Sequence, residues 1–135
     1  ALEPKLQKLM DGIEARTAHC SILNLTVAIN YGGRDEITRA VKMLTQKLGC
    51  GALSADQINQ ESFAACLDTQ DLPDPDLVIR TSGELRTSNF LAWQAAYAEY
   101  EFTPTLWPDF TIDELEAIIS RFGNRIRRFG GVLAG

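Results

Sequence analysis

The sequence predicts an α/β protein in which a parallel β-sheet is flanked by helices. Apolar residues alternate over residues 22–29 and then recur at helical spacing over residues 37–48. The wholly apolar run Leu77–Ile79 is typical of a central parallel strand, and a second helical pattern follows it at residues 90–97. Strands separated by helices and short loops imply a parallel sheet, and we expect residues 1–135 to form a single domain.

The composition is ordinary for a soluble globular protein. Of the 135 residues, 45% are hydrophobic and 23% are charged, which excludes a disordered or collagen-like chain. The net charge of −5 argues against nucleic acid as a partner, although arginines gather at positions 121, 125, 127 and 128. The N-terminus has no apolar signal core, and no stretch approaches the roughly 18 apolar residues of a membrane span.

The cysteines indicate a reducing compartment. Cys20, Cys50 and Cys66 are widely spaced and form no CxxC pair, so neither a disulfide framework nor a zinc site is indicated. We expect core thiols, and therefore a cytoplasmic protein.

The first elements follow from the spacing of apolar residues. Residues 2–13 carry the period of an amphipathic helix, which we expect to end before Thr17. Residues 22–29 alternate with period two and predict a strand. Residues 30–35 contain a glycine-bearing turn between this strand and the next helix.

That next helix begins around Ile37 and is expected to end near Gly49. Beyond it, Ser54 and Gln57 are spaced as a capping box. The box predicts a short helical region that reaches roughly Asp68.

The second half contains two more strands. Residues 71–76 are too rich in proline for regular structure and lead into the strand Leu77–Ile79. Residues 90–97 are predicted to form a buried helix with Ser88 as its N-cap. A short strand is expected at residues 100–102.

The last helix opens with a second capping box, made by Thr111 and Glu114. Its apolar residues recur at alternating steps of three and four, a seam that fits either a core face or a subunit contact. The members of this seam are Ile112, Leu115, Ile119, Phe122, Ile126 and Phe129.

The loop from Arg80 to Phe90 has the composition of an anion site. Arg80 and Arg86 bracket hydroxyl side chains and Gly83, whose backbone N–H groups a ligand could approach. Guanidinium groups match phosphate oxygens, and the N-terminus of a following helix adds partial positive charge, so a phosphate or diphosphate is the expected ligand. Ser88 can cap that helix and also point at the anion.

Other interpretations of these side chains stay open. Arg80 could instead form a structural ion pair with Glu84 or Asp76, and Arg86 could simply be solvated. Arg34 also follows a predicted strand, so both loops are expected at the carboxyl edge of the sheet, where they could face one site.

Glu99 lies where the predicted helix over residues 90–97 ends, and a carboxylate is unfavourable there without a compensating cation. Mg²⁺ takes one or two carboxylates together with substrate phosphates, so Glu99 is a candidate magnesium ligand. Glu99 could equally be an exposed acid like Glu101. His19 is the only histidine, and because it has no evident nucleophile partner we expect it at the surface.

Residues 76–99, followed by Trp107-Pro108-Asp109-Phe110, closely resemble the C-terminal signature of the cis-prenyltransferases, of which undecaprenyl diphosphate synthase is the bacterial type. Residues 30–34 and 127–131 also look like that family. The resemblance implies an undecaprenyl diphosphate synthase-like fold and a homodimer. It also implies a transferase of isoprenoid biosynthesis, which uses Mg²⁺ to condense isopentenyl diphosphate with an allylic diphosphate into a cis-polyprenyl diphosphate.

Carried over by motif, Arg80, Arg86 and Ser88 would bind isopentenyl diphosphate, Arg34 would support the same pocket, and Glu99 would help to hold the metal. The resemblance assigns no catalytic acid or base to this chain. The lipid product would allow peripheral contact with a membrane.

The chain departs from the family pattern in lacking the histidine-containing motif with an aspartate and glycines that binds the allylic diphosphate. It therefore resembles the C-terminal part of a synthase, with the N-terminal strands missing, and we expect this piece alone to be inactive. Ile126 is a smaller departure, because an acidic residue is common there. Two readings stay open: a piece of an enzyme that carries the isopentenyl diphosphate half-site, and a non-catalytic truncated homologue that acts as a binding or assembly module with a partner chain.

Overall fold

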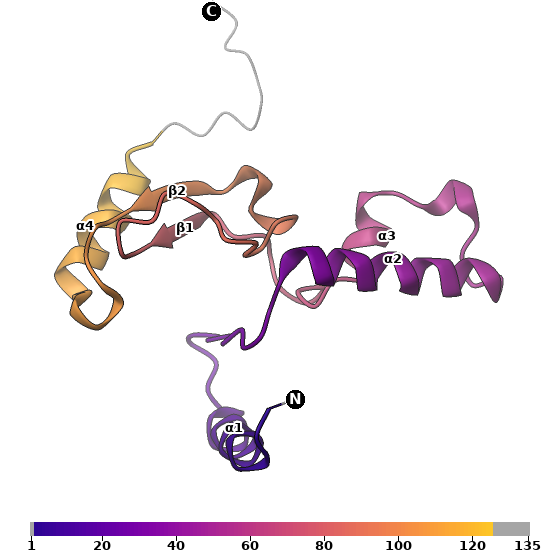
Figure 1. Cartoon of the computed structure of the whole chain (residues 1–135), viewed down its shortest axis with the longest axis horizontal. Coiled ribbons are helices and arrows are strands. Elements are labelled where there is room, and N and C mark those ends of the chain that lie inside the picture. The colour runs from indigo at the N-terminus through magenta and orange to yellow at the C-terminus, as the bar shows by residue number, and fades with distance from the viewer. Residues whose placement is uncertain (1, 126–135) are drawn as a thin grey trace, which may run out of the picture.

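A computed structural model describes residues 2–125 of the chain (Figure 1). The regular elements are two strands, four α-helices and three short 3₁₀ turns within that range. In chain order they are α1 (Pro4–Thr17), α2 (Gly33–Gly49), η1 (Ala55–Gln57), α3 (Gln60–Ala64), β1 (Leu77–Arg80), η2 (Gln94–Tyr97), β2 (Glu99–Phe102), η3 (Trp107–Asp109) and α4 (Ile112–Gly123).

The two strands lie parallel, as the sequence predicts for an α/β protein. Leu77 is opposite Glu99, and Arg80 is opposite Phe102, so both strands end at the same edge. Helix α4 lies along this small sheet, whereas α2 and α3 pack together elsewhere, and α1 stands apart from the other elements (Figure 1). The apolar run Leu77–Ile79 and the strand expected at residues 100–102 are both confirmed.

The strand predicted over residues 22–29 is wrong for this structure. The segment is irregular, and its alternating apolar side chains are exposed, with Leu25 and Val27 at 79% and 67%. A strand needs a neighbour to complete its backbone hydrogen bonds, and within residues 2–125 the sheet consists of β1 and β2 alone.

The helix predicted over residues 90–97 is also wrong, apart from the 3₁₀ turn η2 at its end. Ser88, Asn89 and Leu91 have positive φ angles of 49°, 66° and 45°, which a right-handed helix cannot contain. Ser88 is therefore no helix N-cap. The apolar residues have helical spacing because several of them pack against neighbouring segments from a folded loop, as Trp93 does against Phe63 at 4.4 Å between ring centroids.

The remaining helices agree with the predictions except at their ends. Helix α1 continues to Thr17, and α2 begins at Gly33 and ends at Gly49. The Ser54 and Gln57 capping box is present, but it opens only the 3₁₀ turn η1, and α3 ends at Ala64. In the second box, the Thr111 hydroxyl accepts a hydrogen bond from the Glu114 N–H at 3.3 Å, while the Glu114 carboxylate binds elsewhere.

Within α4, Ile118 is buried, whereas Ile112 and Ile119 of the predicted seam are exposed. Ile126 and Phe129 of that seam lie outside the described residues, as do Arg127 and Arg128. None of the described helices is long and apolar enough to cross a membrane.

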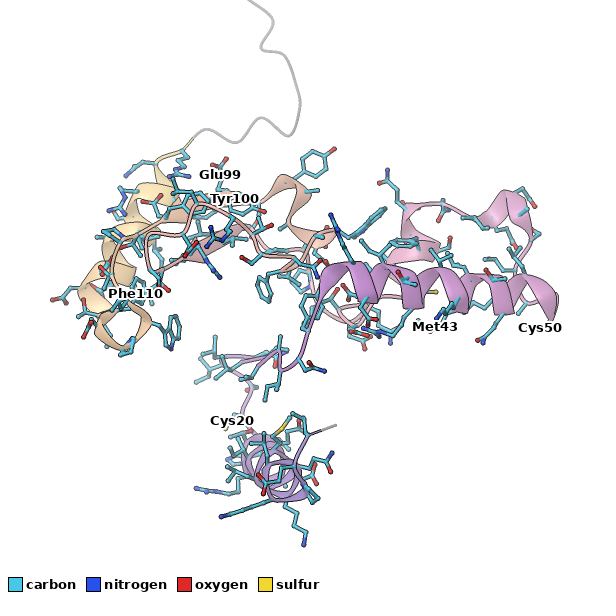
Figure 2. The ribbon with its side chains drawn as sticks, viewed as in Figure 1. Cys20, Met43, Cys50, Glu99, Tyr100 and Phe110 are labelled. Atoms are coloured by element: carbon cyan, nitrogen blue, oxygen red, sulfur yellow. The ribbon has the colours of Figure 1, made fainter. Side chains whose placement is uncertain are left out.

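The hydrophobic core lies between α2 and the segment around α3. Ala40 and Leu44 of α2 pack against Cys66 and Leu67. Cys66 is the buried thiol that the sequence predicts, whereas Cys20 beside α1 and Cys50 at the far end of α2 are exposed (Figure 2). All three thiols are free. The expectation of core thiols therefore holds for one cysteine of three, and His19 lies exposed as expected.

A buried carboxylate joins this core to the segment before β2. Glu36 is only 1% exposed, and its oxygens accept hydrogen bonds from the Tyr31 hydroxyl at 2.5 Å, the Asp68 backbone N–H at 2.8 Å and the Gln94 amide at 3.1 Å. Burial and the hydrogen bond to Glu36 raise the pKa of Tyr31 well above its usual value. Several donors therefore satisfy a charge that would otherwise be costly to bury.

An ion pair on the surface fastens the same region. The Arg39 guanidinium donates two hydrogen bonds of 2.6 Å to the Asp68 carboxylate and one of 2.9 Å to Asp35. This fork geometry lowers the pKa of Asp68 and raises that of Arg39.

We expect Glu36→Gln to lower the free energy of unfolding by about 3 kcal/mol, because an amide nitrogen would face donors that now bind a carboxylate oxygen. Denaturant titration of the chain measures this. The matched control Glu116→Gln changes an exposed glutamate of α4 and should alter stability by less than about 0.5 kcal/mol. Equal stability of the two variants would contradict the role of Glu36.

The Arg39 and Asp68 pair should make stability depend on pH. Because the folded pKa of Asp68 is lowered, the pair stabilises the fold above the unfolded value of about 3.9, and this contribution is lost as the pH falls through the folded pKa. Arg39→Gln should therefore cost on the order of 1 kcal/mol at neutral pH and nothing in strong acid. Thermal unfolding of both proteins across this range checks it, with Lys42→Gln as the control on the same exposed helix surface.

Candidate functional site

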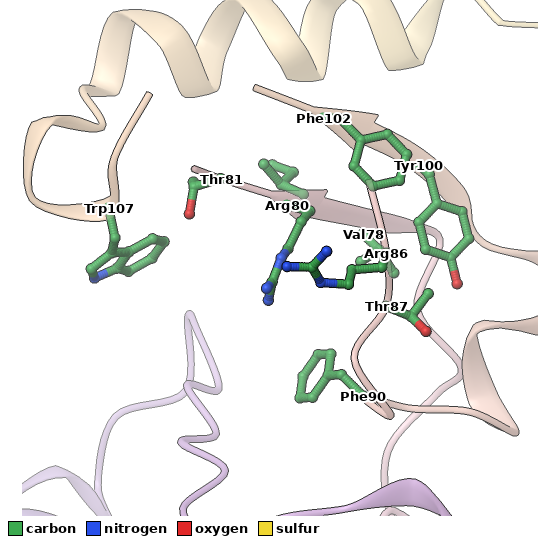
Figure 3. Close-up of a pocket in the computed structure, with 10 residues that line it drawn as sticks. Val78, Arg80, Thr81, Arg86, Thr87, Phe90, Tyr100, Phe102 and Trp107 are labelled. Atoms are coloured by element: carbon green, nitrogen blue, oxygen red, sulfur yellow. The ribbon is translucent and has the colours of Figure 1, made fainter. Parts of the chain in front are cut away.

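A cavity of about 280 Å³ lies beside the carboxyl edge of β1 (Figure 3). Its wall combines cationic, hydroxyl and aromatic side chains from both strands and from the loops that follow them. The lining residues are Val78, Ile79, Arg80, Thr81, Arg86, Thr87, Phe90, Tyr100, Phe102 and Trp107.

The Arg80 guanidinium is the least compensated charge in this cavity. Its Nε is buried without a hydrogen-bond partner, and none of its nitrogens forms an ion pair with the residues that the structure describes. The alternative that Arg80 pairs with Glu84 is not observed, because Glu84 pairs with Arg86. A half-buried cation without an anion is costly, so the cavity favours an anionic ligand.

Arg86 lines the same cavity as Arg80 (Figure 3). Its side chain is 69% exposed, and within residues 2–125 its ion-pair partner is the Glu84 carboxylate. Two guanidinium groups and one carboxylate leave a net positive charge, and the Thr81 and Thr87 side chains also line the cavity. Arg86 thus lines the cavity and is at the same time largely exposed to solvent.

The first turn of the loop is fastened to the segment after β2. Ser82 and Gly83 have positive φ angles of 69° and 67°, and their N–H groups donate to the carbonyls of Thr105 at 2.8 Å and Thr103 at 2.9 Å. These N–H groups are therefore not available to a ligand, contrary to the prediction made for Gly83. The candidate groups for an anion at this cavity are therefore the side chains of its wall rather than these two backbone amides.

Helix α4 in turn supports that segment. The Glu114 carboxylate accepts hydrogen bonds from the hydroxyls of Thr103 and Thr105, the latter at 3.1 Å. Thr103 is buried, so its hydroxyl needs this partner. The position of the Arg80 loop consequently depends on α4.

Two predicted site residues lie outside the cavity wall. The Ser88 side chain is exposed and next to Thr87, which does line the cavity. The Arg34 side chain is exposed at the start of α2. The loops that carry these residues do meet, since the Arg34 N–H donates to the Asn89 side chain at 2.9 Å.

Glu99 lies on the other face of the sheet from Arg80. Tyr100 and Phe102 point into the cavity, whereas Glu99 and Glu101 alternate with them and bind the arginines of the α4 segment. Arg125 donates to Glu99 at 3.0 Å and to Glu101 at 2.5 Å. The structure therefore does not bring Glu99 to the guanidinium groups of the cavity.

Residues 2–125 contain no group of three or more His, Cys, Asp or Glu side chains that could hold a metal ion. The Arg125 guanidinium occupies the place between Glu99 and Glu101 where a cation would lie. Glu101 is only 14% exposed and is also bound by Arg121, so it is not the exposed acid that the sequence suggested.

The aromatic wall was missed in the sequence. Tyr100 and Phe102 lie two positions apart on β2 and stack at 6.0 Å between ring centroids, and Trp107 faces them from the turn η3. The signal was the period of two in the segment from Tyr100 to Phe102, which places both rings on one face of a strand.

A second cavity of about 360 Å³ lies between residues 26–31, residues 68–75 and Gln94. Its only arginine is Arg39, which Asp35 and Asp68 already neutralise. The unpaired Arg80 guanidinium therefore distinguishes the first cavity from the second.

Comparison with known proteins gives a consistent result. Residues 1–130 match the family described as "Putative undecaprenyl diphosphate synthase". An isoprenyl transferase of Brucella abortus is 50% identical over 131 residues, covering 97% of this chain and 52% of that protein. An isoprenyl transferase of Streptococcus agalactiae is 54% identical over 121 residues, covering 87% of this chain and 48% of that protein.

Two solved structures share the fold. Lavandulyl diphosphate synthase from Lavandula x intermedia, in complex with dimethylallyl diphosphate, superposes with a TM-score of 0.90 at 35% identity, covering 96% of this chain and 56% of that one. A probable undecaprenyl diphosphate synthase from Campylobacter jejuni gives 0.79 at 41% identity, covering 96% and 58%. The expected fold is confirmed, and the chain spans about half the length of the relatives that it matches.

Proposed function

Because this chain belongs to the undecaprenyl diphosphate synthase family, we propose that it supplies the isopentenyl diphosphate half-site of a cis-prenyltransferase. The whole enzyme condenses isopentenyl diphosphate with an allylic diphosphate to form a cis-polyprenyl diphosphate. The observation that carries the proposal is the pair Arg80 and Arg86, which line one cavity and, among the described residues, have one ion-pair partner between the two of them, the Glu84 carboxylate bound to Arg86.

The two arginines bind the diphosphate by charge-assisted hydrogen bonds, and Arg80 gains the partner that it lacks among the described residues. Thr81 and Thr87 line the same space. Phe90, Tyr100, Phe102 and Trp107 offer an apolar wall to the isopentenyl group. The site thus orients one substrate and fixes its charged end, which lowers the entropic cost of the condensation.

Ser88 and Arg34 belong to the proposed site as residues of the two loops that meet beside the cavity. Ser88 directly follows Thr87 of the cavity wall, and its hydroxyl is a further candidate donor to an anion. Arg34 adds positive charge at the start of α2.

Mg²⁺ is the proposed cofactor, with Glu99 as one ligand, since metal charge on the diphosphates is the chemistry that such a condensation needs. The residues described do not fit this group in their present arrangement, because Glu99 is bound to Arg125 on the face opposite Arg80. No step at the Arg80 cavity is therefore assigned to the metal.

A homodimer is proposed from the surface of α4, where Ile112 and Ile119 are exposed at the spacing of a helix contact. We place the protein in the cytoplasm because its three cysteines are free thiols. We propose that residues 1–135 form one domain. Its binding partners are the diphosphate substrates and not nucleic acid. Contact with a membrane is through the lipid product.

The alternative function is a truncated, non-catalytic homologue that acts as a binding or assembly module. The observation that favours it is the exposed apolar surface of residues 22–29 and of α1, which buries none of its residues. A second polypeptide could cover this surface.

We expect Arg80→Ala to weaken the binding of isopentenyl diphosphate by on the order of 2 kcal/mol, because one charge-assisted contact is lost. Titration calorimetry on the chain measures the dissociation constant, and the Michaelis constant and turnover of the complete protein give the same comparison. Arg16→Ala, an exposed arginine of α1, is the matched control and should bind as the unaltered chain does. Equal binding by Arg80→Ala would contradict the assignment.

The isolated chain should show no turnover, because the motif that would bind the allylic diphosphate is absent from it. Incorporation of radiolabelled isopentenyl diphosphate, with an allylic diphosphate and Mg²⁺ supplied, measures this. Any polyprenyl product from the purified chain would refute the expectation. Binding of isopentenyl diphosphate without product is the result that agrees with a half-site.

A further inference from the structure

We propose that Asn89 is a positioning residue that fixes the diphosphate-binding loop by capping helix α2 from a distant part of the chain. The inference rests on the proposed function, because the loop that Asn89 fixes carries Arg86, Thr87 and Phe90 of the cavity. Asn89 itself lies outside the cavity wall, and it acts through these neighbours.

Helix α2 has no cap of its own. Its N-cap residue is Gly32, which offers no side chain to the free N–H groups of the first turn. The Asn89 carbonyl oxygen accepts a hydrogen bond from the Gly33 N–H at 2.8 Å, and the Asn89 Oδ1 accepts one from the Arg34 N–H at 2.9 Å. One residue therefore satisfies two helix-end donors with its backbone and its side chain.

The two segments touch so closely that only glycine fits on the α2 side. A Cβ atom on Gly33 would lie 2.9 Å from the Ala92 Cβ and 3.1 Å from the Asn89 carbonyl oxygen. A Cβ on Gly32 would lie 3.0 Å from the Asn89 Nδ2. The glycine pair thus serves the approach of the loop to the helix.

The loop conformation itself needs an external support. Ser88, Asn89 and Leu91 all have positive φ, which asparagine tolerates and which serine and leucine adopt at a cost. Such backbone persists where surrounding contacts determine it. The cap on α2 is one such contact, and the edge-to-face packing of Tyr31 on Phe90, at 5.7 Å between ring centroids, is another.

The consequence reaches the cavity through the chain itself. Arg86 and Thr87 precede Asn89 and Phe90 follows it, so a loop released from α2 moves a guanidinium, a hydroxyl and an aromatic ring of the wall together. The cap also occupies the N–H groups of Gly33 and Arg34. These donors therefore position the loop and do not bind the anion.

The test compares Asn89→Gly with a matched loss of a cap elsewhere. Glycine keeps the positive φ and the backbone carbonyl at position 89 but removes the Oδ1 acceptor. The control is Asn59→Gly, which removes the side-chain acceptor that binds the Ser62 N–H at 2.8 Å at the start of α3, away from the cavity. A second variant, Gly33→Ala, pushes the loop from the helix side with every hydrogen-bonding group retained.

Two quantities are measured on the folded 135-residue chains, whose secondary structure is first matched by circular dichroism. Titration calorimetry with inorganic diphosphate and with isopentenyl diphosphate gives affinities. Amide hydrogen exchange by NMR gives the protection of the Gly33 and Arg34 N–H groups. We expect Asn89→Gly and Gly33→Ala to weaken both ligands by about fivefold to tenfold, the factor of one lost hydrogen bond, and to speed exchange at Arg34. Asn59→Gly should do neither.

The double variant Asn89→Gly, Gly33→Ala should lose less affinity than the product of the two single losses, because both changes release the same contact. The inference is overturned if the unaltered chain binds and the Asn89 and Gly33 variants bind equally well, or if Asn59→Gly weakens binding as much. If the unaltered chain binds neither ligand, the proposed function fails instead. Unchanged exchange at Arg34 in Asn89→Gly would then still refute the cap.

Discussion

The described part of this fold depends on one buried carboxylate. Glu36 lies in the first turn of α2, and its oxygens bind Tyr31 before the helix, Asp68 after α3 and Gln94 before β2. These segments are far apart in the sequence, and few apolar side chains are buried to hold them together. The hydrogen bonds of the Glu36 carboxylate therefore hold α2 in one position relative to β2. In other proteins a larger hydrophobic core has this role.

The candidate site inherits its geometry from that position. Tyr31, bound to Glu36, packs on Phe90, and the start of α2 meets the loop at Asn89. On the other side, α4 holds the turn after β2 through Glu114, and that turn holds Ser82 and Gly83. The Arg80 loop is thus supported at both ends by helices that do not themselves touch the proposed ligand.

Charge pairing and burial together distinguish Arg80 from the other described arginines. Arg39 binds Asp35 and Asp68, and Arg121 and Arg125 bind the two glutamates of β2. These ion pairs join different elements of the fold, and each of the three guanidinium groups is neutralised by a carboxylate. Arg80, half-buried in the cavity wall, has no such partner among the described residues, and this contrast within one small structure is what points to an external anion.

The sequence by itself determined the α/β class, the strands at Leu77 and Tyr100, the helices α1, α2 and α4, and the arginine loop, because these follow from local periodicity and from residue types that bind phosphate. It could not determine that residues 22–29 stay unpaired, since a strand exists only beside a neighbour. Only the tertiary structure decided that residues 87–91 form a loop that contains positive φ angles and caps α2. The same holds for the contact of Glu99, which binds Arg125 and does not face Arg80. The physical reason is the same in each case: spacing along the chain fixes which side chains share a face, whereas the partner that a face meets is fixed by segments distant in the sequence.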